Sequence, residues 1–164
     1  MKPTVEKDVD QPVSKRSGFT LVEIMIVVAI IGLLAALTLP SFAKARTRSL
    51  GVRVALDMQT FGDAFIVYAA ENGRYPADSH ATLPPGAGME NYLDDGKWYE
   101  ETAIGGNFNW EGPDAYPYAG VSVFDHTVSD EDLLEIDNLV DDGVLATGSY
   151  RKTSNGRFTY IVEE

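Results

Sequence analysis

Residues 19–39 read FTLVEIMIVVAIIGLLAALTL, a run of 21 residues in which Glu23 carries the only charge. As an α-helix this run is about 31 Å long, close to the roughly 30 Å hydrocarbon core of a bilayer. It exceeds the apolar core expected of an ordinary secretory signal peptide. The buried helix of a soluble protein seldom reaches this length without a polar face. The run is therefore predicted to be inserted in a membrane.

The composition of the whole chain excludes several classes of protein. Its 164 residues include 25 Asp and Glu against 13 Lys and Arg, for a formal net charge of −12. A nucleic-acid-binding protein needs a basic face, so no nucleic-acid partner is expected. The chain has no cysteine, which excludes disulfide scaffolds and cysteine-ligated metal sites. Length and apolar content suit one globular domain in addition to the apolar run.

Basic residues flank the apolar run on both sides. Lys15 and Arg16 precede it, which favours a cytoplasmic N-terminus by the positive-inside rule. The same rule also counts the basic residues that follow it, which are Lys44, Arg46, Arg48 and Arg53. The charges alone therefore leave the orientation in the membrane open.

Glu23 is an acidic side chain within an apolar helix. A carboxylate in hydrocarbon costs up to about 2.5–3.5 kcal/mol on insertion scales, which makes a functional role the default hypothesis. The alternative is structural, because Glu23 lies four residues after Phe19 and its side chain can reach the headgroups from there. Considered alone, this residue favours neither interpretation.

The stretch from Lys15 to Glu23, KRSGFTLVE, closely resembles the N-terminal signature of type IV pilins and type II secretion pseudopilins. In that family a basic leader ends in Gly, a Phe begins the mature chain and a Glu follows four residues later. Gly32 and Pro40 also stand where pilin-like proteins commonly carry these residues. The resemblance is closest to major pseudopilins, although the leader is longer than in many type IV pilins.

The resemblance implies how the chain is processed and placed. A prepilin peptidase would cut between Gly18 and Phe19 and methylate the new amine of Phe19. The chain would cross the inner membrane once, with its C-terminus outside the cytoplasm. An inner-membrane assembly platform would then move it into a periplasmic or cell-surface filament, either as a homopolymer or mixed with other pilin-like subunits.

The resemblance also implies roles within the filament. Glu23 would pair with the N-terminal amine of Phe19 in a neighbouring copy, which would fix the axial offset between subunits. Pro40 lacks an amide hydrogen and is expected to kink or loosen the helix. Gly32 lowers helix propensity, and either flexibility or close helix packing would account for it.

The helix is expected to continue beyond the apolar run. Apolar residues recur at spacings of 4, 3, 4 and 3 across residues 41–71, which is typical of a helix with one buried stripe. They are Val54, Met58, Phe61, Phe65 and Tyr68. Asn72-Gly73 is expected to end the helix. The predicted organisation is a leader at 1–18, a membrane and filament-core helix at 19–40, its amphipathic continuation at 41–72, and a small head at 73–164.

The head is predicted to be α+β, as in the pilin-like fold, with a small antiparallel sheet against the long helix. Residues 121–124 and 158–162 are expected to be strands, the latter joined to 149–153 by a turn at Asn155-Gly156. Ser129 is expected to cap a helix over 130–140. Residues 77–88 are expected to be an irregular loop, and residues 105–110 a loop with packed aromatic side chains.

Three acidic residues form the one candidate metal site. Asp137, Asp141 and Asp142 could place oxygen ligands around Ca²⁺, although the EF-hand spacing is absent. The resemblance supports calcium, because major pseudopilins hold this ion in a C-terminal loop. The isolated histidines, His80 and His126, are expected to be surface residues. No catalytic motif is recognisable, and the protein is not expected to be an enzyme.

The sequence therefore predicts a filament subunit and leaves two alternatives. One is a minor or adhesive type IV pilin, whose head would bind a surface. The other is a periplasmic protein with an uncleaved membrane anchor that never polymerises. That second alternative explains the apolar run but gives no role to Glu23 or to the Gly18-Phe19 junction.

Overall fold

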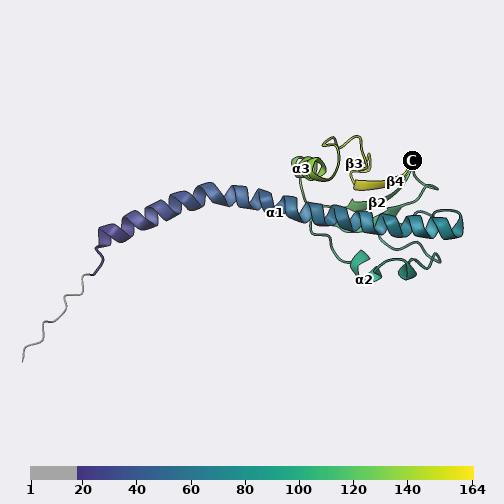
Figure 1. Cartoon of the computed structure of the whole chain (residues 1–164), viewed down its shortest axis with the longest axis horizontal. Helices are drawn as coiled ribbons and strands as arrows, with labels where there is room; N and C mark the ends of the chain where they lie inside the picture. The colour runs from purple at the N-terminus through teal and green to yellow at the C-terminus, as the bar shows by residue number, and fades with distance from the viewer. Residues whose placement is uncertain (1–17) are drawn as a thin grey trace, which may run out of the picture. The chain divides into compact units, whose positions relative to one another are not determined.

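The computed structural model describes residues 18–164, so the predicted leader up to Ser17 lies outside the described residues. The chain divides into two compact units, Met1–Pro40 and Ser41–Glu164. In chain order the described elements are α1 (Leu21–Asn72), the 3₁₀ helix η1 (Met89–Asn91), α2 (Asp95–Trp98), β1 (Asn107–Glu111), β2 (Ala119–Phe124), α3 (Asp130–Val140), β3 (Tyr150–Lys152) and β4 (Phe158–Glu163) (Figure 1).

Helix α1 belongs to both units, and its part in the second unit is amphipathic as predicted. The core-facing stripe consists of Val54, Met58, Phe61 and Phe65, all buried, with Tyr68 half-buried beyond them. The helix ends where predicted, at Asn72, and Gly73 follows with a φ of 73°. That left-handed conformation suits glycine because it has no Cβ atom.

Four antiparallel strands form one sheet in the order β1-β2-β4-β3. Trp110 pairs with Val121, and Val121 pairs with Tyr160, so these three side chains share one face. That face packs on α1, where Phe65 stacks on Trp110 with 3.7 Å between ring centroids. A long helix against an antiparallel sheet confirms the predicted α+β, pilin-like architecture.

Residues 107–111 correct one prediction, because they form strand β1 instead of an aromatic loop. Phe108 and Trp110 alternate with Asn109 and Glu111, which is the two-residue period of a strand. All four residues are buried. Asn109 and Glu111 therefore lie inside the protein, on the sheet face away from α1. The alternation of apolar and polar residues would have predicted that these two side chains are exposed to solvent.

The remaining head elements agree with the sequence. Helix α3 begins after Ser129, whose side chain and that of Asp132 form a reciprocal capping box. Strands β3 and β4 pair across the predicted turn, where Gly156 has a φ of 82°. Residues 77–88 are irregular apart from one bridge between Ser79 and Trp110.

Helix α3 is held on α1 by both apolar and charged contacts. Ile136 is fully buried and lies directly over Gly51 of α1. Glu135 accepts hydrogen bonds from Lys44 at 2.6 Å and from Arg48 at 2.9 Å. The hydrogen bonds from Arg48 and Lys44 lower the pKa of the Glu135 carboxyl. Helix α3 is thereby fixed on the part of α1 that directly follows the apolar run.

Candidate functional site

The first half of α1 presents an apolar surface that no described part of the chain covers. Its large side chains from Phe19 to Leu39 are all exposed, with Phe19 at 84% and Leu39 at 68%. Helix α1 includes a window with a mean hydropathy of 2.7, which is long and apolar enough to cross a membrane. Exposed apolar surface on this scale marks a site of contact with lipid or with other proteins.

Glu23 and Thr20 form a capping box at the start of α1. The Glu23 Oε2 atom accepts hydrogen bonds from the Thr20 backbone N–H and from its hydroxyl, both at 2.8 Å. The Thr20 Oγ1 atom accepts in turn from the Glu23 backbone N–H at 3.2 Å. Among the described residues, no donor contacts Oε1 of Glu23. Glu23 thus caps its own helix and keeps one oxygen for another partner.

The predicted processing residues lie immediately before this cap. Gly18 and Phe19 are exposed and precede the first helical residue, Leu21. Such a position is accessible to a protease. The capping role of Thr20 was not predicted, although T-x-x-E before an apolar run is the sequence pattern of a capping box.

The roles of Gly32 and Pro40 in flexibility, packing or kinking of the helix stay predictions. A Cβ atom at Gly32 would meet nothing within 4 Å in the described chain, so close packing at this glycine would have to involve another molecule. Helix α1 is continuous through Pro40. The kink expected there stays a prediction.

The three acidic residues predicted as a metal site do come together. Carboxylate oxygens of Asp137, Asp141 and Asp142 lie within 4.8 Å of one another, at the end of α3 and in the loop after it. Asp141 accepts from the backbone N–H groups of Ser149 and Tyr150, at 2.5 and 2.9 Å. The backbone of the α3–β3 loop thereby holds Asp141 in place.

Asp142 is fixed in a similar way. Its Oδ1 atom accepts from the backbone N–H of Val144 at 2.8 Å, and its Oδ2 atom accepts from the Thr147 hydroxyl at 2.7 Å. Two of the three carboxylates are therefore positioned by the loop itself.

Asp137 differs from the other two because it is fully buried and neither carboxylate oxygen has a hydrogen-bond partner. Burial, together with the negative charges of Asp141 and Asp142, raises the pKa of Asp137 to about 6. No described Lys or Arg forms a salt bridge with any of the three aspartates. An unpaired buried carboxylate is costly, and a bound cation would remove that cost. The residues therefore fit a hard, oxygen-ligated ion.

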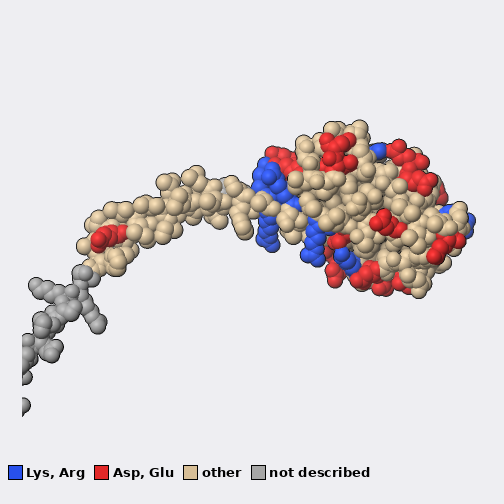
Figure 2. Space-filling model, in the orientation of Figure 1, with Lys and Arg blue, Asp and Glu red and all other residues tan. Residues whose placement is uncertain are grey.

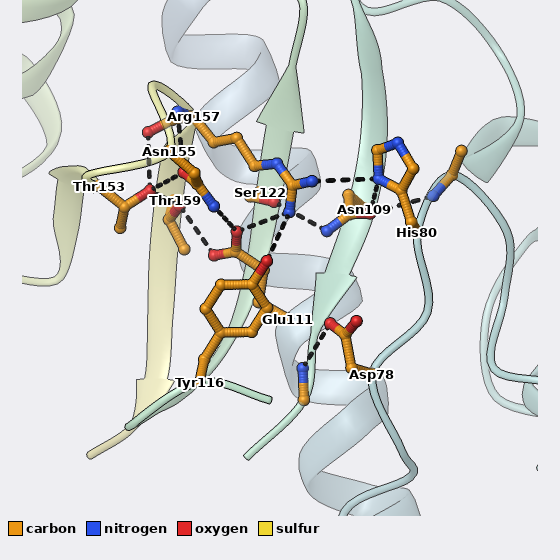
Figure 3. A network of polar contacts seen from close by, with 12 residues as sticks. Asp78, His80, Asn109, Glu111, Tyr116, Ser122, Thr153, Asn155, Arg157 and Thr159 are labelled. Carbon is orange, nitrogen blue, oxygen red and sulfur yellow. Dashed lines mark hydrogen bonds and ion pairs between the residues drawn. The ribbon is translucent and has the colours of Figure 1, made fainter. Parts of the chain in front are cut away.

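A second polar cluster surrounds the buried carboxylate of Glu111 on the sheet face away from α1 (Figure 3). Arg157 Nη1 and Asn155 Nδ2 both donate to Glu111 Oε1, at 2.9 and 2.8 Å. The hydroxyls of Tyr118 and Thr159 donate to Oε2, at 2.9 and 3.2 Å. The cluster joins the end of β1 to β4 and to the turn before it, so its role is structural.

Arg157 extends this cluster to one of the two histidines. Its Nη2 atom lies 3.1 Å from Nδ1 of His80, whose ring is exposed as expected. His126 is half-buried, with its two ring nitrogens 3.2 Å from the carbonyl oxygens of Val128 and Gly156. The His80 ring also packs against Phe124, with 4.8 Å between ring centroids. His126 is thus less exposed than expected from the sequence.

These features define a class of protein: an α+β head built on the second half of a helix whose first half is apolar and begins at a capped Glu. Residues 13–39 match the family described as the prokaryotic N-terminal methylation motif. The match confirms the resemblance to prepilin-type proteins.

Three curated proteins illustrate the similarity. The type II secretion system core protein G of Aeromonas hydrophila is 34% identical over 62 residues, which cover 38% of this chain and 43% of that protein. The type IV major pilin protein of Myxococcus xanthus is 41% identical over 61 residues, or 37% and 28% of the two chains. A fimbrial protein of Dichelobacter nodosus is 35% identical over 102 residues, or 62% and 61%.

This chain thus spans less than two thirds of the length of each of these relatives. No solved structure matches it.

Proposed function

We propose that the protein is a structural, non-enzymatic subunit of a type II secretion pseudopilus or a type IV pilus-like filament. The observation that carries this proposal is the methylation motif, placed on a helix whose exposed apolar half continues into the core of a folded head. A bilayer covers that half before assembly, and neighbouring copies cover it afterwards. The chain crosses the inner membrane once, with its head outside the cytoplasm.

Processing creates the charge that assembly uses. Cleavage after Gly18 by a prepilin peptidase leaves a cationic, then methylated, amine on Phe19. In a bundle of apolar helices this amine and the Glu23 carboxylate of a neighbouring copy are each costly alone, and pairing removes both isolated charges. The free Oε1 atom of Glu23 is available for this contact while Oε2 caps the helix. An inner-membrane assembly platform would bring the two subunits together.

The test of processing is the intact mass and N-terminal sequence of the protein from membrane and sheared-surface fractions. We expect a chain that begins at methylated Phe19. An uncleaved chain in both fractions would contradict the proposal and favour a simple membrane anchor. A chain cut after Leu39 would instead identify a secreted soluble domain.

We further propose that Asp137, Asp141 and Asp142 bind Ca²⁺. The unpaired oxygens of buried Asp137 support it most directly, and calcium accepts six to eight oxygen ligands from flexible loops. When bound, the ion supplies the positive charge that this end of α3 lacks. The α3–β3 loop would then be tied to the helix, which would stiffen the head. Calcium titration followed by thermal unfolding tests this proposal, and a protein whose melting temperature does not rise with calcium would contradict it.

A further inference from the structure

Three basic residues of α1, Lys44, Arg46 and Arg48, form a group that we call the basic collar. They follow Pro40 within eight residues, and no acidic residue occurs between Glu23 and Asp57. The rest of the chain is strongly acidic, with 22 acidic and 9 basic side chains in residues 19–164. Figure 2 shows blue atoms gathered where the head begins along α1, with red atoms beside them and over the rest of the visible head.

The head neutralises only part of the basic collar. Lys44 pairs with Glu135 of α3 at 2.6 Å and with Glu131 at 3.8 Å. Arg48 also pairs with Glu135, yet the side chains of Lys44 and Arg48 remain 48% exposed. Arg46 lies on another face of α1, is exposed, and forms no salt bridge with any described residue. The collar therefore presents positive charge to a partner outside the head.

The position of the collar in the chain indicates what that partner is. Twenty helical residues cross a hydrocarbon core of about 30 Å. Counted along the sequence from Glu23, the twentieth residue is Phe42, and Phe42 is 73% exposed. Lys44, Arg46 and Arg48 then follow within about 9 Å of helix, which is the depth of the headgroup layer. Aromatic and basic residues at this level are typical of anchors at a membrane interface.

From the collar's charge and position, we propose that it binds the phosphate groups of anionic phospholipids in the leaflet that the head faces. This inference rests on the proposed membrane insertion and adds a ligand to it. Membrane surface charge acts within a Debye length, about 8 Å at physiological salt. The collar lies within that distance. Of the acidic residues, Glu131 and Glu135 of α3 lie at the collar and are paired with its basic side chains. Those of α1 itself resume only at Asp57, about 22 Å beyond Phe42 along the helix. The collar thus counteracts the repulsion between an acidic head and an anionic membrane.

Arg53 provides a matched control within the same helix. It is seven residues after Arg46, so it lies on nearly the same helix face, and it is exposed. Its Cα atom is about 16 Å beyond Phe42 along the helix, outside the headgroup layer. Replacing either arginine removes the same charge, and only Arg46 is expected to touch phosphate.

The experiment uses the full chain reconstituted in nanodiscs of phosphatidylcholine and phosphatidylglycerol. Spin-labelled versions of each lipid report, by electron paramagnetic resonance, the fraction held at the protein surface. We expect the wild type to prefer phosphatidylglycerol and Arg46→Gln to lower the preference by up to about fivefold. Arg53→Gln should leave it unchanged. Lys15 and Arg16 are common to all variants, so differences between variants report the collar alone.

Several results would overturn the inference. Equal retention of the two lipids by the wild type would do so, as would equal losses in Arg46→Gln and Arg53→Gln. Arg46→Gln could also keep the lipid preference of the wild type and yet form fewer filaments. That result would show that the collar binds an acidic surface of a second copy instead of lipid. If the chain inserts in the disc but shows no lipid preference, only the proposed lipid binding by the collar is contradicted. If the chain fails to insert, the proposed membrane insertion of the apolar run is contradicted as well.

Discussion

Gly51 of α1 lies against the side chain of Ile136 in α3, and a Cβ atom at position 51 would overlap the end of that isoleucine. Glycine usually weakens a helix, by about 1 kcal/mol relative to alanine. Here its missing side chain lets two helices approach closely. The position of α3, and therefore of the acidic loop that follows it, depends on this contact.

Gly51→Ala should lower the free energy of unfolding by about 1–3 kcal/mol despite its higher helix propensity, because the added methyl group overpacks the contact. Chemical denaturation measures the loss. Combination with Ile136→Val, which removes one methylene, should recover part of it, so the two changes should be non-additive. An increase in stability from Gly51→Ala alone would show that α3 can move away without cost.

Glu23→Gln separates the two roles of this side chain. Glutamine can maintain the capping box through its amide oxygen, but it has no charge to pair with the amine of a neighbouring Phe19. We expect normal amounts of protein in the membrane and at least about a tenfold loss of sheared filaments, since breaking such a pair is strongly destabilising.

Thr20→Val is the control for the preceding experiment. It removes the capping hydroxyl and retains the Glu23 charge, so filament yield should remain near that of the wild type. Normal filaments from Glu23→Gln would contradict charge pairing. Equal losses in both variants would instead assign the effect to the cap.

Calcium should stabilise the protein more at pH 7 than at pH 5. The raised pKa of Asp137, about 6 instead of 3.8, means that the folded state binds a proton more tightly than the unfolded chain does. Without calcium, stability should therefore fall as the pH rises from about 4 to about 6, by at most about 3 kcal/mol. Thermal unfolding with and without the ion measures this dependence.

Asp137→Asn should increase stability at pH 7 in the absence of calcium, because it removes the buried charge, and it should abolish the effect of the ion. Glu90→Gln changes an exposed carboxylate elsewhere in the head. It should alter neither the stability without calcium nor the stabilisation by calcium. A calcium response that persists in Asp137→Asn would place the ion at another site.

Asn155→Asp should destabilise the head at pH 7 by about 1–3 kcal/mol. The substitution replaces the donor that lies 2.8 Å from the buried Glu111 carboxylate with a second negative charge. Asn91→Asp, an exposed site with the same chemical change, serves as the control. Equal melting temperatures for the two variants would show that Arg157 alone suffices to neutralise this site.

The sequence predicted those parts of the fold in which one local pattern determines the structure. The stripe from Val54 to Phe65 required a helix with a buried face, and Ser129 and Gly156 marked a cap and a turn. Strand β1 was missed because Asn109 and Glu111 appear as solvent-facing residues in the sequence, whereas both are fully buried.

The site was predictable to a similar degree. The motif around Gly18, Phe19 and Glu23 is local, so its spacing is visible in the sequence. The acidic cluster was also visible, but the burial that leaves Asp137 without partners arises from the packing of α3 on α1. Likewise, the donors to Glu111 come from residues 7 to 48 positions away, and only tertiary structure brings them together.

The stacking of Phe65 on Trp110 also has a mechanical consequence. The sheet is attached to the side of α1 by several aromatic contacts along the helix, including Phe61 with Phe108. A pull along the axis of α1 would load these contacts in shear and strain them together, instead of peeling them apart one by one. A subunit drawn out of a membrane by its helix would therefore carry its head with it intact.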